Sequence, residues 1–191
     1  MPSVSAAAVL PPPEARLALR AASRADIDAL VALEHAAFVT DRAERRAIRH
    51  AVDSATMDVI VALVEDGRAE VLVGAAVLER RRASRIARLS SIAVAPGRNG
   101  LGIGGRLLAA AEDEALSRGC DRLRLEVRAD NGAGIRLYER RGYSRFAVRP
   151  DYYEDGMEAW RYEKALAPPA RQEAPPRGKA SSKSSPHTRR R

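Results

Sequence analysis

The stretch IAVAPGRNGLGIGGRLL, residues 92–108, joins the end of an apolar strand, a glycine-rich loop and the start of an apolar helix. Three glycines alternate at positions 100, 102 and 104, and Gly105 follows directly. Backbone amides at the start of a helix, together with the positive end of the helix dipole, attract anions such as phosphate. Glycine allows close approach because it has no Cβ. The stretch therefore predicts a phosphate-binding loop between a strand and a helix.

Two common phosphate-binding motifs fit this loop poorly. Gly100, Gly102 and Gly105 satisfy the GxGxxG spacing of dinucleotide-binding folds, but that motif begins at the very end of its strand. Here the segment APGRN separates Val94 from Gly100. A P-loop requires Gly-Lys-Ser/Thr after its glycines, and this order is missing from the stretch. We therefore expect neither of these folds.

The remaining sequence alternates between strand and helix patterns within residues 14–166, which predicts a single α/β (α+β) domain. Alternating or continuous apolar runs predict strands at 16–22, 58–66, 69–81, 85–94, 121–127, 143–149 and 158–166. The turn Asp66-Gly67 predicts a hairpin between the second and third of these strands. Helical periodicity predicts helices after Ser23, near 41–52, at about 102–118 and within 131–142. Ser23 and Asp26 have the spacing of a capping box.

The net charge of +8 lies mostly in one terminal segment. Residues 167–191 contain seven Lys or Arg against one Glu, which leaves the preceding residues close to neutral. This segment is rich in Pro, Ser and Ala, so we expect a disordered basic tail that solubilises the protein or makes weak contact with nucleic acid. Residues 1–13 are expected to form a flexible N-terminus.

Composition also narrows the cellular setting. A single cysteine, Cys120, excludes a disulfide framework and fits a reducing compartment. Three scattered histidines form no metal-binding pattern, so we expect no metal. No apolar run approaches the ~18 residues of a membrane-spanning helix, and residues 1–13 lack the basic start of a signal peptide. These features predict a cytoplasmic protein that does not bind membranes.

Two longer segments, IAVAPGRNGLGIGGRLLAAAEDEALSRG and LRLEVRADNGAGIRLYERRGYSRF, resemble the GCN5-related N-acetyltransferases (GNAT). The family signature is a Q/R-x-x-G-x-G/A loop after a strand, followed by a helix, a strand and an Asn-containing helix. The resemblance implies a mixed sheet of about seven strands, with helices on both faces and a splay between the fourth and fifth strands. One departure is Asn99, which occupies the Gln/Arg position while Arg98 stands one residue earlier.

The resemblance implies acetyl-CoA as the phosphate carrier and as a co-substrate. Amides of the loop would hold the pyrophosphate, the backbone of the preceding strand would pair with the pantetheine, and an asparagine would reach the pantetheine arm. The residues that the resemblance assigns to this binding are Ile92, Ala93, Val94, Asn99, Gly100, Leu101, Gly102, Ile103, Gly104 and Asn131.

The segment LEVRADNGAGIRLYERRGY is similar to the RimI-like group, the ribosomal-protein alanine N-acetyltransferases. By this resemblance Glu126 is the general base and Tyr138 is the general acid. Glu34, which interrupts an apolar helical stripe, is the rival base or a substrate-binding residue. We expect Arg124 to hold the Glu126 carboxylate ionised. In the same group an aromatic pair precedes the last strand, which implies that Tyr152 and Tyr153 flank the acceptor.

Three functions follow from these observations. The first is acetyl transfer from acetyl-CoA to a protein or peptide amine, either an N-terminal α-amino group or a lysine, with ribosomal proteins among the acceptors. The second is the same chemistry on a small amine, which a cluster of acceptor-side carboxylates would favour. The third is a non-catalytic acyl-CoA-binding or RNA-associated module; the presence of Glu126 and Tyr138 speaks against it.

Overall fold

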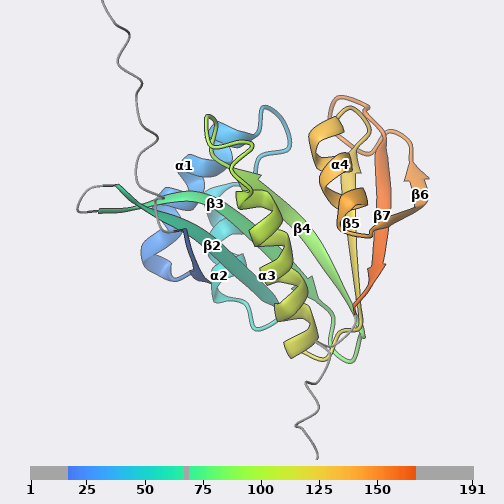
Figure 1. Ribbon diagram of the computed structural model, residues 1–191, viewed down its shortest axis with the longest axis horizontal. Helices are drawn as coiled ribbons and strands as arrows, with labels where there is room; N and C mark the ends of the chain where they lie inside the picture. Colours follow the sequence, from blue (N-terminus) through green and yellow to red (C-terminus); the bar gives the residue numbers. More distant parts are fainter. Residues whose placement is uncertain (1–16, 67–68, 167–191) are drawn as a thin grey trace, which may run out of the picture.

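The computed structural model describes residues 17–66 and 69–166, in which seven strands form one sheet in the order β1-β2-β3-β4-β5-β7-β6 (Figure 1). The elements are β1 (Ala18–Ala21), η1 (Arg24–Asp26), α1 (Ile27–Ala37), α2 (Arg45–Asp53), β2 (Met57–Asp66), β3 (Ala69–Arg80), β4 (Ile86–Val94), α3 (Ile103–Ser117), β5 (Arg122–Arg128), α4 (Gly132–Arg140), β6 (Ser144–Arg149) and β7 (Ala159–Ala165). The expected flexible N-terminus, the basic tail and Gly67 of the hairpin turn lie outside the described residues.

Strand β4 divides the sheet. Strands β1 to β4 form an antiparallel series, whereas β4 and β5 are parallel and pair only from Ile86↔Arg122 to Leu89↔Leu125. Beyond that last pair the two strands diverge, and Figure 1 shows the resulting V-shaped opening beside α3 and α4. A parallel connection needs a crossover, which α3 provides. The mixed seven-stranded sheet and its splay between the fourth and fifth strands confirm the predicted fold.

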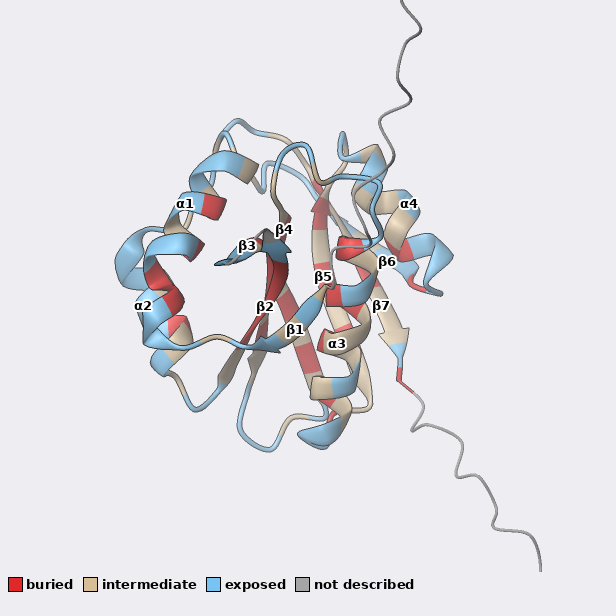
Figure 2. Ribbon diagram, turned by 60° about the vertical axis from the view of Figure 1, so that its left-hand side comes forward, coloured by how far each residue is buried: buried red, intermediate tan, exposed pale blue. Residues whose placement is uncertain are grey.

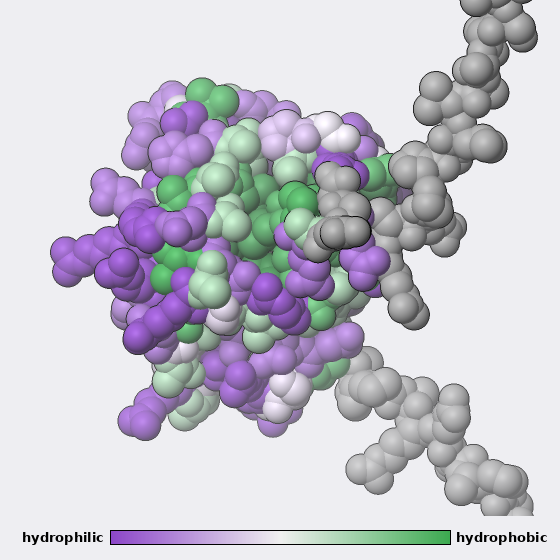
Figure 3. Space-filling model, turned by 90° about the vertical axis from the view of Figure 1, so that its left-hand side faces the viewer, coloured by the Kyte–Doolittle hydropathy of each residue, from purple (hydrophilic) through white to green (hydrophobic). Residues whose placement is uncertain are grey.

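Each face of the sheet carries its own hydrophobic core, because the strand side chains alternate between the two faces. On one face α3 packs against strands β2 to β5, and on the other α1 and α2 pack against β2, β3 and β4. Figure 2 shows buried residues along the strands and on the inward sides of α1 and α2. Figure 3 shows one face on which apolar side chains gather centrally within a polar surround. Helices therefore cover both faces, as predicted.

Helix α3 is fixed by a close contact with β3. Leu107 and Leu108 are fully buried, and burying a leucine side chain contributes roughly 1.5–3 kcal/mol. A Cβ added at Gly74 would lie 3.0 Å from the Ala93 carbonyl oxygen and 3.0 Å from a Leu107 methyl group. The absence of a side chain at Gly74 thus lets α3 lie directly on the strands that lead to the glycine loop.

The second helix begins later than its sequence pattern indicates. Periodicity predicts a start near Asp41, but α2 begins at Arg45. Asp41 has a φ of 55°, outside the right-handed helical region, and the Ala43 amide donates to the Glu34 carboxylate at 2.9 Å. This long-range hydrogen bond holds the segment between α1 and α2 as a loop.

None of the helices in residues 17–66 and 69–166 combines the length and the hydrophobicity that crossing a membrane requires.

The start of η1 is stabilised by the predicted pair of Ser23 and Asp26. The Ser23 amide donates to Asp26 Oδ2 at 2.7 Å, and Arg20 donates to both carboxylate oxygens at 2.8 Å. The hydrogen-bonded Arg20 guanidinium holds the pKa of the buried Asp26 carboxyl far below its usual value. These contacts tie β1 to the first helical segment.

We predict that Asp26→Asn lowers the free energy of unfolding by about 1–2 kcal/mol at pH 7, because a capping interaction and a charge-assisted pair are lost. The ion pair adds little more, since the Arg20 side chain is 43% exposed and solvent screens it. A carboxyl with a depressed folded-state pKa stabilises the fold above its ordinary value of 3.8 and loses that effect as the pH falls below it. The difference from wild type, measured by chemical denaturation, should therefore be constant above about pH 5 and shrink progressively as the pH falls below about 4.

Asp28→Asn is the matched control, because the Asp28 side chain is 83% exposed on α1. Its effect should stay within ~0.5 kcal/mol. An equal loss in both variants would show that Asp26 has no special role.

Candidate functional site

The glycine loop between β4 and α3 is built from left-handed backbone conformations. Gly97, Gly100 and Gly102 have φ values of 80°, 82° and 76°. Side chains with a Cβ rarely adopt these angles, so glycine is required for the path of the loop. Gly102 is the residue directly before α3 and aims the chain into the helix.

The amides of this loop are unpaired in the described part of the chain. No amide of residues 99–105 donates to a described carbonyl or side chain. The flanking amides are paired: the Arg98 amide donates to the Ala95 carbonyl, and the Arg106 amide donates to the Gly102 carbonyl. The amides of residues 99–105 lie at the start of a helix of 15 residues, where the helix dipole is positive. The loop is therefore suited to hold an anionic group, as its sequence predicts.

A cavity of about 940 Å³ opens where β4 and β5 separate. It is lined by α1, α2 and their connecting loop, by the face of β2 to β5, and by the connection between β6 and β7. The candidate residues that line it are Glu34, Ile92, Ala93, Glu126, Asn131, Tyr138, Tyr152 and Tyr153. The structure thus brings together residues more than 100 positions apart in the sequence. Val94 at the end of β4 and residues 99–104, in the glycine loop and the start of α3, lie outside its lining.

Glu126 projects from β5 toward this cavity and is held by two arginines. Its Oε2 accepts from Arg88 Nε at 2.8 Å and its Oε1 accepts from Arg161 Nε at 3.2 Å. The side chain is only 12% exposed. The expectation that Arg124 holds this carboxylate is wrong, because Arg124 pairs with Glu163 at 2.6 Å. The two ion pairs instead fix the orientation of Glu126 from β4 and β7.

Arg88 and Arg161 were not identified from the sequence. Arg88 is the one charged residue in the central strand β4, which is a signal that a partner lies nearby. Which carboxylate it pairs with depends on the register of β4 against β5, two strands whose paired residues lie 36 positions apart. Local sequence patterns do not encode that register.

Tyr138 lies on α4 and is 5% exposed. Its ring packs edge-to-face against Tyr143, with 5.8 Å between the ring centroids. Burial raises the pKa of its phenol well above the ordinary value, with a smaller contribution from Tyr153. The hydroxyl therefore stays protonated at neutral pH and can serve as a proton donor.

Glu34 lies half-buried on α1 and also faces the cavity. Burial raises the pKa of its carboxyl, while the hydrogen bond from the Ala43 amide opposes that rise. One oxygen is thus committed to holding the loop between α1 and α2. Glu34 has a structural task even if it also contacts an acceptor.

Asn131 caps α4 at the edge of the opening. Its Oδ1 accepts from the Gly134 amide at 2.9 Å, so the carbonyl end of the side chain is used within the helix. Its Nδ2 has no partner among the described residues and remains available as a donor toward the cavity.

Tyr152 and Tyr153 form an aromatic wall in the connection between β6 and β7, with ring centroids 5.1 Å apart. Arg88 Nη2 donates to the Tyr152 hydroxyl at 3.0 Å, and the Arg128 guanidinium lies 4.9 Å from the centre of the Tyr153 ring. Burial raises the pKa of Tyr153 to about 12. The Glu154 amide also donates to Asp41 at 3.2 Å, which joins this connection to the loop between α1 and α2.

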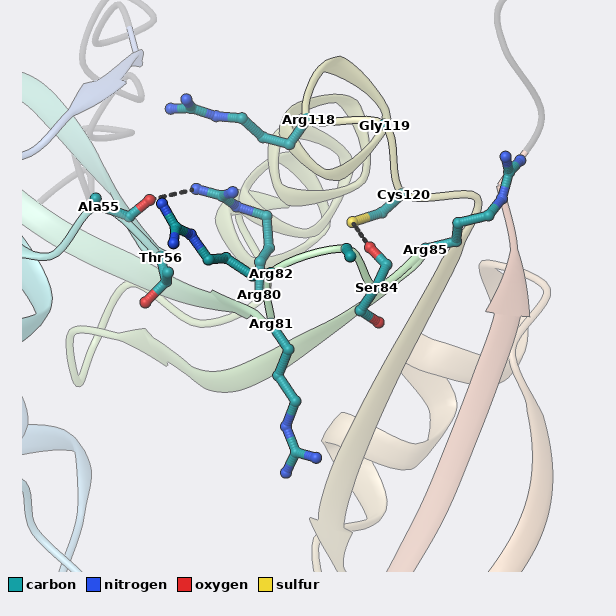
Figure 4. Close-up of a pocket in the computed structure, with 11 residues that line it drawn as sticks. Ala55, Thr56, Arg80, Arg81, Arg82, Ser84, Arg85, Arg118, Gly119 and Cys120 are labelled. Carbon is teal, nitrogen blue, oxygen red and sulfur yellow. Dashed lines mark hydrogen bonds between the residues drawn. The ribbon is translucent and has the colours of Figure 1, made fainter.

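A second cavity of about 500 Å³ lies at the C-terminal end of β3, beside the C-terminal end of α3 (Figure 4). Its lining includes five arginines, at positions 80, 81, 82, 85 and 118. Arg80 and Arg118 are paired with Asp58, and Arg85 is paired with Asp121. Figure 4 shows Arg81 and Arg85 pointing away from the other arginines. These side chains do not converge, so the opening between β4 and β5 is the candidate site.

Comparisons with known proteins agree with this geometry. A sequence model of the acetyltransferase (GNAT) family matches residues 27–143. The chain is 45% identical over 74 residues to the ribosomal protein bS18-alanine N-acetyltransferase of Escherichia coli K12, and the match covers 38% of this chain and 50% of that relative. The chain therefore spans about half the length of this curated relative.

Two solved structures share the fold. The ribosomal-protein-S18-alanine N-acetyltransferase from Escherichia coli has a TM-score of 0.70 and 24% identity, over 82% of this chain and 98% of that chain. Ard1 from Thermoplasma volcanium has a TM-score of 0.69 and 26% identity, over 80% and 99% of the two chains. The match extends to the whole sheet and its splay.

We predict that Gly104→Glu abolishes measurable acetyl-CoA binding while the protein still folds. A Cβ at Gly104 would lie 3.5 Å from Leu137 and 3.7 Å from Val94, which are ordinary contacts that the fold tolerates. The added carboxylate, however, would bring negative charge to the amides predicted to hold a pyrophosphate. Calorimetry with acetyl-CoA and a thermal melt measure the two effects separately.

Ser117→Glu adds a comparable carboxylate at the exposed far end of α3 and should bind acetyl-CoA like wild type. Near-unchanged affinity in Gly104→Glu would contradict the assignment of this loop to acetyl-CoA.

Proposed function

The chain belongs to the GNAT family of acetyltransferases, and we propose that it transfers the acetyl group of acetyl-CoA to a primary amine of a protein. The proposed acceptor is an N-terminal α-amino group or a lysine side chain. The observation that carries the proposal is the single cavity that gathers Glu34, Glu126, Tyr138 and the tyrosine pair at the opening between β4 and β5.

The relatives support a protein acceptor. The Escherichia coli relative is named for acetylating the alanine of a ribosomal protein, and it shares 45% identity with this chain over half of its own length. The aromatic wall of Tyr152 and Tyr153 gives the cavity an apolar surface against which a peptide backbone can pack. A ribosomal protein is therefore the first class of acceptor to test.

We propose that acetyl-CoA binds along β4 and the glycine loop. The unpaired amides of residues 99–104 would hold the pyrophosphate. The backbone of Ile92, Ala93 and Val94 would pair with the pantetheine, because β5 no longer pairs with β4 beyond Leu89. Asn131 Nδ2 would donate to the same arm. In this arrangement the thioester reaches the cavity that Tyr138 and Glu126 line.

The reaction requires three proton transfers, because the acceptor nitrogen loses two protons between ammonium ion and amide and the departing thiolate gains one. The acceptor arrives as an ammonium ion with a pKa near 8 for an α-amino group, so it must lose a proton before it attacks the thioester carbonyl. Glu126 is proposed to accept that proton, directly or through water. As the C–N bond forms and the C–S bond breaks, the nitrogen gives up its second proton to water, and Tyr138, whose hydroxyl is protonated at neutral pH, is proposed to protonate the departing thiolate.

The proposed function predicts thiol release from acetyl-CoA in the presence of a peptide with a free N-terminal amine. Three acceptors distinguish the alternatives: that peptide, the same peptide with a blocked N-terminus and one lysine, and a polyamine. Mass spectrometry then locates the added acetyl group. Thiol release with the polyamine but with neither peptide would favour a small-amine enzyme. Tight acetyl-CoA binding without thiol release in the presence of any of the three amines would favour a non-catalytic module.

Two isosteric variants test the proton transfers. Tyr138→Phe removes only the hydroxyl, so turnover should fall about 100- to 10,000-fold with acetyl-CoA affinity unchanged. Glu126→Gln should also lower turnover, and its defect should shrink as the pH rises because the acceptor then deprotonates unaided. Initial rates between pH 6 and pH 9.5 measure both effects.

Glu34→Gln is the matched comparison, since glutamine retains the oxygen that accepts from the Ala43 amide. It should lower turnover only mildly. If Glu34→Gln lost most of its turnover while Glu126→Gln stayed near wild type, the general base would be Glu34 on α1.

A further inference from the structure

Arg88 lies one residue before the last point at which β4 and β5 stay paired. It lies opposite Arg124 in the parallel ladder, and Leu89↔Leu125 is the final pair before the strands diverge. Across the antiparallel ladder its partner on β3 is Glu79. The Arg88 side chain is 41% exposed and lines the cavity. Arg88 therefore stands at the apex of the opening, on the acceptor side.

The three nitrogen atoms of the Arg88 guanidinium contact three different elements. Nε donates to Glu126 Oε2 on β5 at 2.8 Å, and Nη2 donates to the Tyr152 hydroxyl in the β6–β7 connection at 3.0 Å. Nη1 makes a longer contact of 3.4 Å with Glu79 on β3. A guanidinium is a rigid planar fork, so contacts on its separate nitrogens fix the positions of their partners relative to one another.

Of the two arginines that donate to Glu126, Arg88 is the one that lines the cavity. Arg161 approaches the other carboxylate oxygen from β7, and its guanidinium lies 4.9 Å from the centre of the Phe146 ring. Tyr153 also interacts electrostatically with Glu126, while Glu34 lines the same cavity from α1. Arg161 lies outside the cavity lining, whereas Arg88 belongs to it and also contacts the acceptor wall.

We propose that Arg88 is a positioning residue, which holds the Glu126 carboxylate in its reactive orientation and ties it to the Tyr152 wall. This inference rests on the proposed acetyl transfer with Glu126 as the base. In this proposal Arg88 both orients the Glu126 carboxylate and sets the distance between that carboxylate and the Tyr152 wall, which an acceptor peptide would contact. Misplacing a reacting group by about 1 Å can cost ~100-fold in rate, so the alignment matters for turnover.

The first test compares Arg88→Gln with Arg88→Lys in steady-state assays with a free N-terminal peptide. Arg88→Gln should lower kcat roughly 10- to 100-fold. Arg88→Lys keeps the charge but not the planar fork, so kcat should fall in this variant as well.

The second test is a double-mutant cycle with Glu126→Gln. If Arg88 acts through Glu126, Arg88→Gln should change kcat less than about twofold once Glu126 is already glutamine. Full additivity of the two losses would overturn the proposal. Tyr152→Phe removes the other contact, and it should raise the peptide KM several-fold with kcat nearly unchanged; an unaltered KM would overturn the link to the acceptor wall.

Arg124→Gln is the matched control. Arg124 lies directly across the ladder from Arg88, pairs with Glu163 and does not line the cavity. It should retain the wild-type kcat and pH profile. Thermal melts and acetyl-CoA calorimetry on every variant separate misfolding from a catalytic defect.

The outcomes also separate this inference from the proposed function. If the wild-type protein is active, Glu126→Gln is nearly inactive and Arg88→Gln turns over like the wild type, only the role of Arg88 is overturned. Absence of thiol release by the wild-type protein would overturn the proposed function itself, and the role of Arg88 with it.

Discussion

The parallel pairing of β4 with β5 stops after Leu89↔Leu125, and the arrangement of the site depends on that interruption. Buried backbone amides and carbonyls require partners, so two strands that separate inside a sheet leave a place where another extended chain can bind. The same divergence opens the cavity that Glu126 and Tyr138 line. A continuous sheet would have closed both the proposed pantetheine path and the acceptor cavity.

The glycine loop and α3 could be predicted from sequence because their determinants are local. Gly100 and Gly102 have left-handed φ values that suit glycine, and the apolar residues between Ile103 and Ala115 form the buried face of α3. Leu123, Leu125 and Val127 alternate along β5 and are buried, so Glu126 lies on the other face of that strand. The spacing of residues within each segment is therefore enough to predict these elements and their buried faces.

The environment of the candidate base was not predictable in the same way. Sequence proximity favoured Arg124 as the partner of Glu126. In the structure Arg124 donates to Glu163 instead. The actual partners, Arg88 and Arg161, come from strands on either side. The late start of α2 has a similar origin, because a hydrogen bond from Ala43 to Glu34 holds the intervening loop. Both depend on contacts between distant segments.

The walls of the acceptor cavity come from the α1–α2 loop and the β6–β7 connection, which are joined by the contact between Asp41 and the Glu154 amide. The glycine loop belongs to neither segment. Exposed connections accept substitutions and insertions more readily than packed strands do. The residues that would contact an acceptor can therefore change while the glycine loop stays as it is, so that one frame can accommodate different acceptors.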